Sequence, residues 1–316
     1  MPLFLTEADV AATFSMADAL RVLDAAARKI ADGSAMNAPR QRVNSGAAVL
    51  QVLPAALDGR TGLKTYTVGS RGATFRVTLY APDGALLALI EANTLGQLRT
   101  GGATGLATRY LARADAHRLG VIGTGFQART QIEAICLARG IERVRVWGRD
   151  PGRLQAFCRS VSERVGRPVE AATSARDAVE SADVVVTMTS AAQPVFAGEW
   201  LAPGTHVNAA GSNRATAAEI DAVTVARSAI VAVEDVAQAK VESGDLLAAQ
   251  AAGAFRWDDA VRLADIVAGA ATGRTSDDQL TLFESLGVGI WDVAAANHIY
   301  DACREQGRGV ELPIPA

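Results

Sequence analysis

A glycine turn between two apolar segments constrains the fold of this chain more than any other feature. Residues 119–122 are almost entirely apolar and predict a short buried strand, and a Gly-x-Gly-x-x-Ala turn follows over 123–128. Residues 129–139 are typical of a helix, and 144–147 alternate as a second strand. A dinucleotide-binding βαβ unit requires this order of strand, glycine turn, helix and strand. The alternative is an ordinary connection between a strand and a helix.

The residue types of the turn suit a bound dinucleotide. Gly123 permits the tight turn, Gly125 lets the backbone approach a pyrophosphate, and the small Ala128 lets helix and strand pack closely. The first turn of the helix directs free N–H groups at the phosphates. We therefore expect the whole turn to contact a coenzyme: Gly123, Thr124, Gly125, Phe126, Gln127 and Ala128.

The end of the second strand indicates which coenzyme binds. An NAD site usually has an acidic residue there, whereas an NADP site lacks it and supplies an arginine. Gly148 occupies the position of the acid, and the guanidinium of Arg149 suits a 2′-phosphate. Asp150 is the counter-evidence, although before Pro151 it also suits a helix start. We favour NADP and keep NAD as possible.

Composition excludes several classes of function. With 49% hydrophobic residues among 316, a packed globular protein is the default. A net charge of −3 gives no reason to expect nucleic acid or an anionic membrane as a partner. Three well-separated cysteines suggest reduced thiols in a cytoplasmic protein, and three histidines without ligand spacing suggest no metal site.

The remaining segments predict an α/β chain. Ser15 and Asp18 fit the capping box of a helix that ends near Gly33, and strands with turns between them follow from Arg40 to Glu91. Residues 95–112 are helical in pattern despite three glycines. Beyond the glycine turn, strands near 183–187, 206–209 and 229–233 alternate with helical stretches, and a last helix covers 290–306. This alternation predicts a Rossmann-like, doubly wound parallel sheet after a largely antiparallel α+β region.

Several of these segments together resemble the ornithine cyclodeaminase/mu-crystallin family. The matching segments are Pro39-Arg40, Leu53-Pro54 at the end of a hairpin, 62–64, 98–105, 123–127, 206–213 with 219–221, and 282–287. The resemblance implies a homodimer with a substrate-binding and dimerisation domain over 1–115, completed by 290–316. A Rossmann-like NAD(P)-binding domain over 116–289 would lie between, and the active site would be in the cleft where they meet. Members transfer hydride between a nicotinamide and an α-carbon that bears nitrogen.

Lys64 is the first candidate for catalysis. It lies in the middle of a predicted strand, which is an unusual place for a solvated lysine. By resemblance it meets the carboxylate and the amine of the substrate. A buried ammonium beside an imine can donate a proton, and burial lowers its pKa. The alternative is a solvated lysine on an edge strand.

Arginines are the candidates for anion binding. Arg40 keeps the family's spacing to Lys64 and should clamp the substrate carboxylate, but Arg42 lies on the same strand face and could take this role instead. Arg99 should reach the coenzyme phosphates or the substrate carboxylate, unless it forms a surface salt bridge. We also expect the coenzyme to contact Thr100, Ser190, Asn208 and Ser285.

Asn213 departs from the family pattern. By resemblance it occupies the position of the catalytic aspartate of the cyclodeaminases, but a neutral amide cannot act as a base. It could still hydrogen-bond the substrate or coenzyme, or simply serve as a turn residue. Asn213 therefore argues against cyclodeamination and for simple imine reduction.

The combined hypothesis is an NAD(P)H-dependent reductase of small cyclic imino acids, such as Δ1-pyrroline-2-carboxylate or its six-membered homologue Δ1-piperideine-2-carboxylate. The product would be an L-amino acid such as proline. An ornithine cyclodeaminase and an alanine-type dehydrogenase remain alternatives on the same fold. A crystallin-like coenzyme binder without catalysis is an alternative of another class. Ring size and physiological direction stay open.

Overall fold

Two eight-stranded sheets organise the chain, and each belongs to its own compact unit. The computed structural model describes residues 1–70 and 72–314. The first unit contains residues 1–100 and 288–316, and the second contains 101–287. The division falls inside helix α3 (Asn93–Leu111), whereas the sequence suggested 115, just after that helix.

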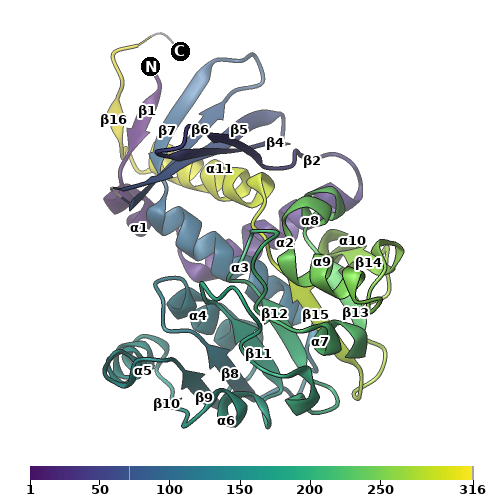
Figure 1. Ribbon diagram of the computed structural model, residues 1–316. Coiled ribbons are helices and arrows are strands. Elements are labelled where there is room, and N and C mark those ends of the chain that lie inside the picture. The colour runs from purple at the N-terminus through teal and green to yellow at the C-terminus, as the bar shows by residue number, and fades with distance from the viewer. Residues whose placement is uncertain (71, 315–316) are drawn as a thin grey trace. The chain divides into compact units, whose positions relative to one another are not determined.

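The first unit is an α+β structure whose sheet is mostly antiparallel. Only β1 and β7 pair in parallel among the strand pairs of this sheet in the described part of the chain. Its strands follow the order β16 (Val310–Glu311), β1 (Leu3–Leu5), β7 (Leu86–Glu91), β6 (Gly72–Tyr80), β5 (Arg60–Gly69), β4 (Val49–Leu57) and β2 (Met36–Asn37), with β3 (Gln41–Asn44) also pairing with β4. The C-terminal helix α11 (Gly289–Glu305) packs against β4, β5 and β6 (Figure 1).

Local signals explain the ends of the first helices. Ser15 and Asp18 form the expected capping box at the start of α2 (Met16–Ala31), and Asp32 rather than Gly33 is the residue that caps its end. A second capping box, at Thr6, begins α1 (Glu7–Thr13), a helix that was not predicted. Strand β4 also runs through Pro54 instead of ending there, because the Pro54 carbonyl accepts from Ala38 and the strand remains paired with β5.

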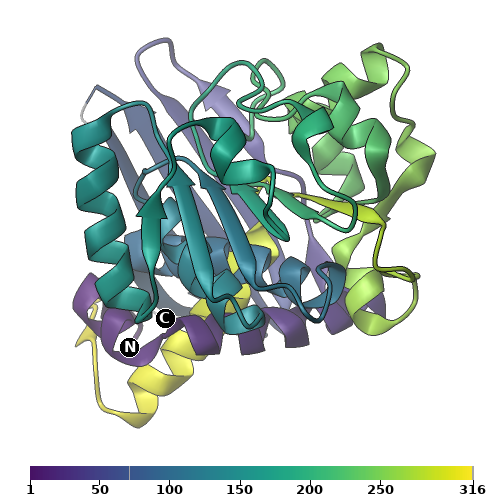
Figure 2. The ribbon, with the colours of Figure 1, turned by 90° about the horizontal axis from the view of Figure 1, so that it is seen from below.

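The second unit confirms the Rossmann-like, doubly wound α/β class. All its strand pairs in the described residues are parallel, and Figure 2 shows several of them side by side in teal and green. The order is β10 (Val169–Ala171), β9 (Arg143–Trp147), β8 (Arg118–Ile122), β11 (Val184–Thr187), β12 (His206–Ala209), β15 (Leu280–Glu284), β13 (Ser228–Val233) and β14 (Ala260–Arg262). The helices are α4 (Ala128–Ala138), α5 (Pro151–Val165), α6 (Ala175–Val179), α7 (Ala222–Arg227), α8 (Val236–Glu242), α9 (Gly244–Ala251) and α10 (Leu263–Ala268).

Both faces of this parallel sheet are buried. Val184 and Val186 of β11 belong to one apolar cluster, with side chains of α4 and α5, and Val185 belongs to another, with side chains of α6, α7 and α9. Because successive side chains of a strand point to opposite faces, helices must cover both sides of the sheet. Across residues 1–70 and 72–314, no helix combines the length and the apolar character needed to cross a bilayer.

Candidate functional site

The glycine turn leads from β8 into α4, as the sequence predicts. The Gly123 N–H donates to the Trp147 carbonyl at 2.9 Å, so the turn is anchored to the end of β9. Gly123 has φ of +120°, and a Cβ there would lie 2.3 Å from the Met188 carbonyl oxygen. A Cβ on Gly125 would meet no atom within 4 Å, so the backbone at this residue is accessible to a ligand. The two glycines are therefore required for different reasons.

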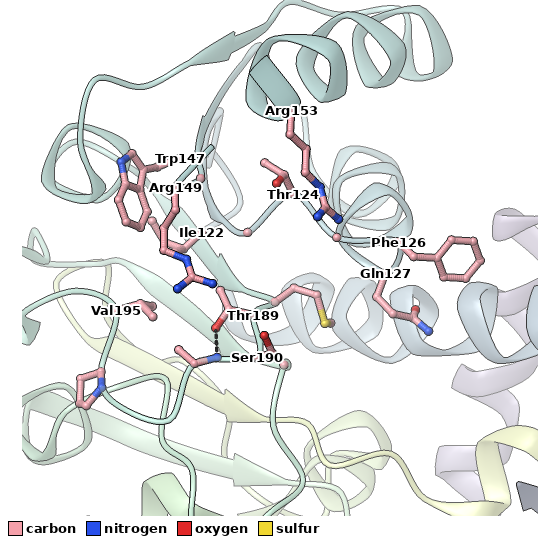
Figure 3. Close-up of a pocket in the computed structure, with 17 residues that line it drawn as sticks. Ile122, Thr124, Phe126, Gln127, Trp147, Arg149, Arg153, Thr189, Ser190 and Val195 are labelled. Atoms are coloured by element: carbon pink, nitrogen blue, oxygen red, sulfur yellow. Dashed lines mark hydrogen bonds between the residues drawn. The ribbon is translucent and has the colours of Figure 1, made fainter. Parts of the chain in front are cut away.

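A cavity of about 620 Å³ lies over this turn, at the carboxyl ends of β8, β9 and β11. We call it the glycine-turn cavity (Figure 3). Its lining residues are Ile122, Gly123, Thr124, Gly125, Phe126, Gln127, Trp147, Gly148, Arg149, Arg153, Met188, Thr189, Ser190, Ala191, Pro194, Val195 and Gly211. The volume is within the range of small-molecule sites, and the carboxyl edge of a parallel sheet is where such folds bind ligands.

Most of the expected coenzyme residues lie at this cavity. Eight of them line it: Gly123, Thr124, Gly125, Phe126, Gln127, Gly148, Arg149 and Ser190. Ala128 was also expected to contact the coenzyme, but it begins α4, is buried and does not line the cavity; its position suits close packing of helix and strand. Asn208 and Ser285 are also buried and do not line the cavity, because Asn208 bonds His206 and Thr108 and Ser285 bonds Glu234. Asn213 lies outside the lining, in the loop after β12.

The residues at the end of β9 favour an anionic ligand. Arg149 and Arg153 both line the cavity, and Arg153 was not predicted from the sequence. Figure 3 shows the Arg153 guanidinium on the side of Thr124 and the Arg149 guanidinium on the side of Thr189. A Cβ on Gly148 would lie 2.8 Å from Thr124, so an acidic side chain does not fit there. Asp150 caps α5 by accepting from the Arg153 N–H at 2.8 Å. Its carboxylate is thus used for a helix start.

A second group of polar side chains, buried except for the half-buried Tyr66, lies in the first unit. We call Lys64, Asp292, Arg99, Arg40, Tyr66 and Gln51 the lysine cluster. Lys64 lies in β5 between β4 and β6, only 4% exposed, so the expected alternative of a solvated edge lysine is wrong. Arg99 in α3 is 6% exposed, which likewise excludes a surface salt bridge.

Asp292 of α11 joins two of these cations. Its Oδ1 accepts from Lys64 Nζ at 3.1 Å and from Arg99 Nε at 2.9 Å. Asp292 is fully buried and was not among the predicted site residues, although a lone acid in the apolar run 288–296 was an available signal. A buried charge must be paired, and here one carboxylate orients two cations.

The environment of Lys64 adjusts its acidity. Burial lowers the pKa of Lys64 to about 8, the charge of Arg99 lowers it as well, and Asp292 opposes both. The Lys64 ammonium also lies 5.1 Å from the centre of the Phe75 ring. A Cβ on Gly96 would be 3.0 Å from Nζ, so this glycine makes room for the ammonium. The result is an amine that can hold or release a proton near neutral pH.

Arg40 and Arg42 differ in their surroundings. Arg40 is 8% exposed and donates to Tyr66 at 3.0 Å and to Gln51 at 3.3 Å. Arg42, in β3, is exposed. Arg40 is thus in the lysine cluster, and its charge also acts on Lys64. Thr100 bonds the Gly96 carbonyl within α3, and it is half-buried.

This chain is similar to known proteins in both sequence and structure. The ornithine cyclodeaminase/mu-crystallin family profile matches residues 1–307. A Delta(1)-pyrroline-2-carboxylate reductase of Bacillus cereus is 37% identical over 230 residues, which are 72% of this chain and 70% of the relative. The structure of the Thermococcus litoralis Delta(1)-pyrroline-2-carboxylate reductase, in complex with NADH and L-proline, has a TM-score of 0.93 and 31% identity, covering 98% and 100% of the two chains. An archaeal alanine dehydrogenase dimer with bound NAD has a TM-score of 0.92 and 31% identity, covering 99% of each chain.

Proposed function

Since this chain belongs to the ornithine cyclodeaminase/mu-crystallin family, we propose that it is a nicotinamide-dependent oxidoreductase that reduces the C=N bond of a small cyclic imino acid. A pyrroline-2-carboxylate or piperideine-2-carboxylate would give an L-amino acid such as proline. The observation that carries the proposal is the buried ammonium of Lys64, held by Asp292 and with its pKa lowered to about 8. The relatives named above support the same reaction class.

The residues divide the reaction between binding and proton transfer. Arg40 binds the substrate carboxylate, for which its buried guanidinium provides charge and direction. Lys64 donates a proton to the imine nitrogen, and Asp292 keeps its ammonium in place. The nicotinamide, when bound, supplies the hydride for the α-carbon. Hydride on carbon and the Lys64 proton on nitrogen together convert C=N into an amine.

Asn213 and Arg99 have supporting parts in the proposal. Asn213 would hydrogen-bond substrate or coenzyme without taking a proton, because an amide is neutral at all relevant pH values. Arg99, held by Asp292, would bind an anionic group of either molecule. Thr100, Asn208 and Ser285 remain proposed coenzyme residues with weaker support, because none of them lines the glycine-turn cavity.

The test of this function is consumption of reduced coenzyme with a panel of imines. We expect turnover with Δ1-pyrroline-2-carboxylate or Δ1-piperideine-2-carboxylate without added ammonia. An alanine-type dehydrogenase would instead need pyruvate with ammonia, and a cyclodeaminase would release ammonia from ornithine without net use of coenzyme. Binding of coenzyme with no turnover of any of these substrates would favour a crystallin-like binder.

We also propose that the coenzyme is NADPH, with NADH as the alternative. The residues that line the cavity include Arg149 and Arg153 but no aspartate or glutamate, and Asp150 caps α5 instead. A charge-assisted hydrogen bond contributes about 1.5–3 kcal/mol, so Arg149→Ala should raise KM for NADPH by about 10- to 100-fold. KM for NADH should change little, because it has no 2′-phosphate.

Steady-state kinetics with both coenzymes check this prediction. Arg159→Ala is the matched control, since Arg159 is exposed on helix α5, which begins just after Arg149, but does not line the cavity. An equal loss of NADPH and NADH affinity would contradict a role in 2′-phosphate recognition.

We further propose a homodimer in the cytoplasm. Val43 of β3 and Leu50 of β4 are paired residues that are 62% and 38% exposed, so they present apolar side chains on one face. Light scattering should give about twice the chain mass of 32.8 kDa. The double variant Val43→Asp, Leu50→Asp should give the mass of a single chain. An unchanged mass would place the dimer contact elsewhere.

The cytoplasmic location is proposed from the cysteines. All three are free and buried, which suits a reducing compartment.

A further inference from the structure

Glu219 is a fully buried carboxyl group in the segment that precedes α7. Its Oε1 accepts from the Thr189 N–H and from the Thr189 hydroxyl, both at 2.6 Å. Its Oε2 accepts from the Gly211 N–H at 2.6 Å and from the Thr187 hydroxyl at 3.0 Å. Each oxygen thus receives two donors, and Thr189 and Gly211 line the glycine-turn cavity.

Further bonds extend this connection along the cavity wall. The Glu219 carbonyl accepts from the Val195 N–H at 2.9 Å. The Thr189 hydroxyl, which donates to Glu219, accepts in turn from the Ala191 N–H at 3.1 Å, shown as the dashed line in Figure 3. Val195 and Ala191 also line the cavity. Residue 219 therefore holds the loop after β11 at both ends and joins it to the loop after β12.

The close approach of this carboxyl group requires glycine at 211. A Cβ on Gly211 would lie 2.5 Å from both oxygens of Glu219 and 2.4 Å from the Thr189 nitrogen. The two loops and the carboxyl group are therefore packed without space for another atom. Loss of a hydrogen bond from Thr189 or Gly211 would therefore act directly on residues that line the cavity.

Opposing effects act on the pKa of Glu219. Burial raises the pKa of Glu219 to about 7, the bonds from Thr189 and Gly211 lower it, and the charge of Asp245 raises it. Asp245 of α9 accepts from the Glu219 and Ile220 N–H groups. The charge of Glu219 also acts on Glu284 of β15, whose pKa is raised well above its ordinary value by burial and by the charge of Asp245.

We propose that Glu219 is a positioning residue for the coenzyme, and that its ionised form sets the cavity walls so that coenzyme binding releases its proton. A carboxylate can accept all four hydrogen bonds, whereas in a protonated carboxyl group one oxygen carries a hydrogen, so that a threonine hydroxyl must reverse its bond or a donor loses its acceptor. The bound coenzyme stabilises the arrangement that the ionised form maintains. This inference rests on the proposed binding of a nicotinamide coenzyme in the glycine-turn cavity.

The consequence is a pH dependence of coenzyme affinity with a defined sign. With a pKa of about 7, Glu219 should be mostly ionised above pH 8, so the affinity should vary little there. As pH falls through 7, Glu219 of the free protein takes up a proton. This proton must be released when the coenzyme binds, so Kd rises by up to tenfold per pH unit. Calorimetric titration with NADH from pH 5.5 to 8.5, without any imine, measures this dependence. NADH is preferred because a 2′-phosphate titrates near pH 6 by itself.

Glu219→Gln separates this role from a merely structural one. The amide has nearly the same shape but only one accepting oxygen, so we expect about tenfold weaker binding at pH 8 and a Kd that no longer depends on pH. Asp183→Asn is the matched control. Asp183 is also buried and accepts from backbone N–H groups of His117 and Arg118, but it precedes β11, at the opposite end from the cavity. This control should lose stability and keep the pH dependence.

Several outcomes would overturn the inference. A wild-type Kd that is constant from pH 6 to 8.5 excludes the proposal. A Kd of Glu219→Gln that depends on pH as steeply as that of the wild type also excludes it. If that variant does not fold, the number of protons released on binding at pH 7, measured in two buffers of different ionisation enthalpy, decides the question, and zero release excludes the proposal. If only NADPH binds, the 2′-phosphate contributes equally in both proteins. The difference between wild type and Glu219→Gln in the slope of log Kd against pH then reports on Glu219. Failure to reduce any imine would refute the proposed reaction but leave this binding result standing.

Discussion

Replacing Lys64 with methionine should lower kcat for imine reduction by about 10²- to 10⁴-fold, the usual contribution of a general acid. Methionine has a similar length but provides no proton. The fold should persist because Asp292 keeps Arg99 as a partner at 2.9 Å and is not left as an unpaired buried charge. Coenzyme affinity should change little, since Lys64 does not line the glycine-turn cavity and Arg99 keeps its bond to Asp292.

The pH profile provides the second part of this test. Lys64 is protonated below its pKa of about 8, so kcat/KM for reduction should fall as pH rises through 8. Asp292 favours the charged form of Lys64, so Asp292→Asn should move this limb of the profile to lower pH. Stopped-flow measurement of NADPH oxidation across pH 6 to 10 would resolve both effects.

One control and one contradicting outcome make the prediction specific. Lys240→Met is the matched variant, because Lys240 is an exposed lysine of α8 and should not affect turnover. If Lys64→Met keeps kcat within about threefold of the wild type, Lys64 is not the proton donor. The fold assignment would survive that result, but the mechanism would not.

Alanine at Gly123 should destabilise the protein, while alanine at Gly125 should spare the fold and impair coenzyme binding. At Gly123 the backbone has φ of +120°, and a Cβ would lie 2.3 Å from the Met188 carbonyl oxygen. The disfavoured backbone costs about 1–3 kcal/mol and the overlap about 1–3 kcal/mol more. We therefore expect the free energy of unfolding to fall by roughly 2–6 kcal/mol, measured by denaturant titration.

Gly125 serves as the matched comparison within the same turn. A Cβ there meets no atom within 4 Å, so the free energy of unfolding should change by less than about 1 kcal/mol. The added methyl group would occupy the space through which a pyrophosphate approaches the backbone, and coenzyme Kd should rise by about tenfold or more. Equal effects of both variants on stability would contradict this division of roles.

Local sequence patterns were sufficient for much of the fold. The strand, glycine turn, helix and strand from 118 to 147 are where they were predicted, and so is the capping box at Ser15. These signals succeed because backbone conformation, side-chain periodicity and caps act over a few residues. The short β1 and β16 were missed because each is stabilised by a strand remote in the sequence, β1 by β7 and β16 by β1.

The sequence by itself determined the class of fold and the glycine turn, and it singled out Lys64 as a candidate for catalysis; all three depend on local chemistry or on a family pattern. Only the tertiary structure decided what surrounds those residues. Asp292 is 228 positions from Lys64, and Glu219 is 30 from Thr189. No periodicity predicts which buried acid contacts which donor, because that choice is made when helices and loops pack against the sheets. Burial then sets the pKa values of Lys64 and Glu219, on which the proposed proton transfer and coenzyme linkage depend.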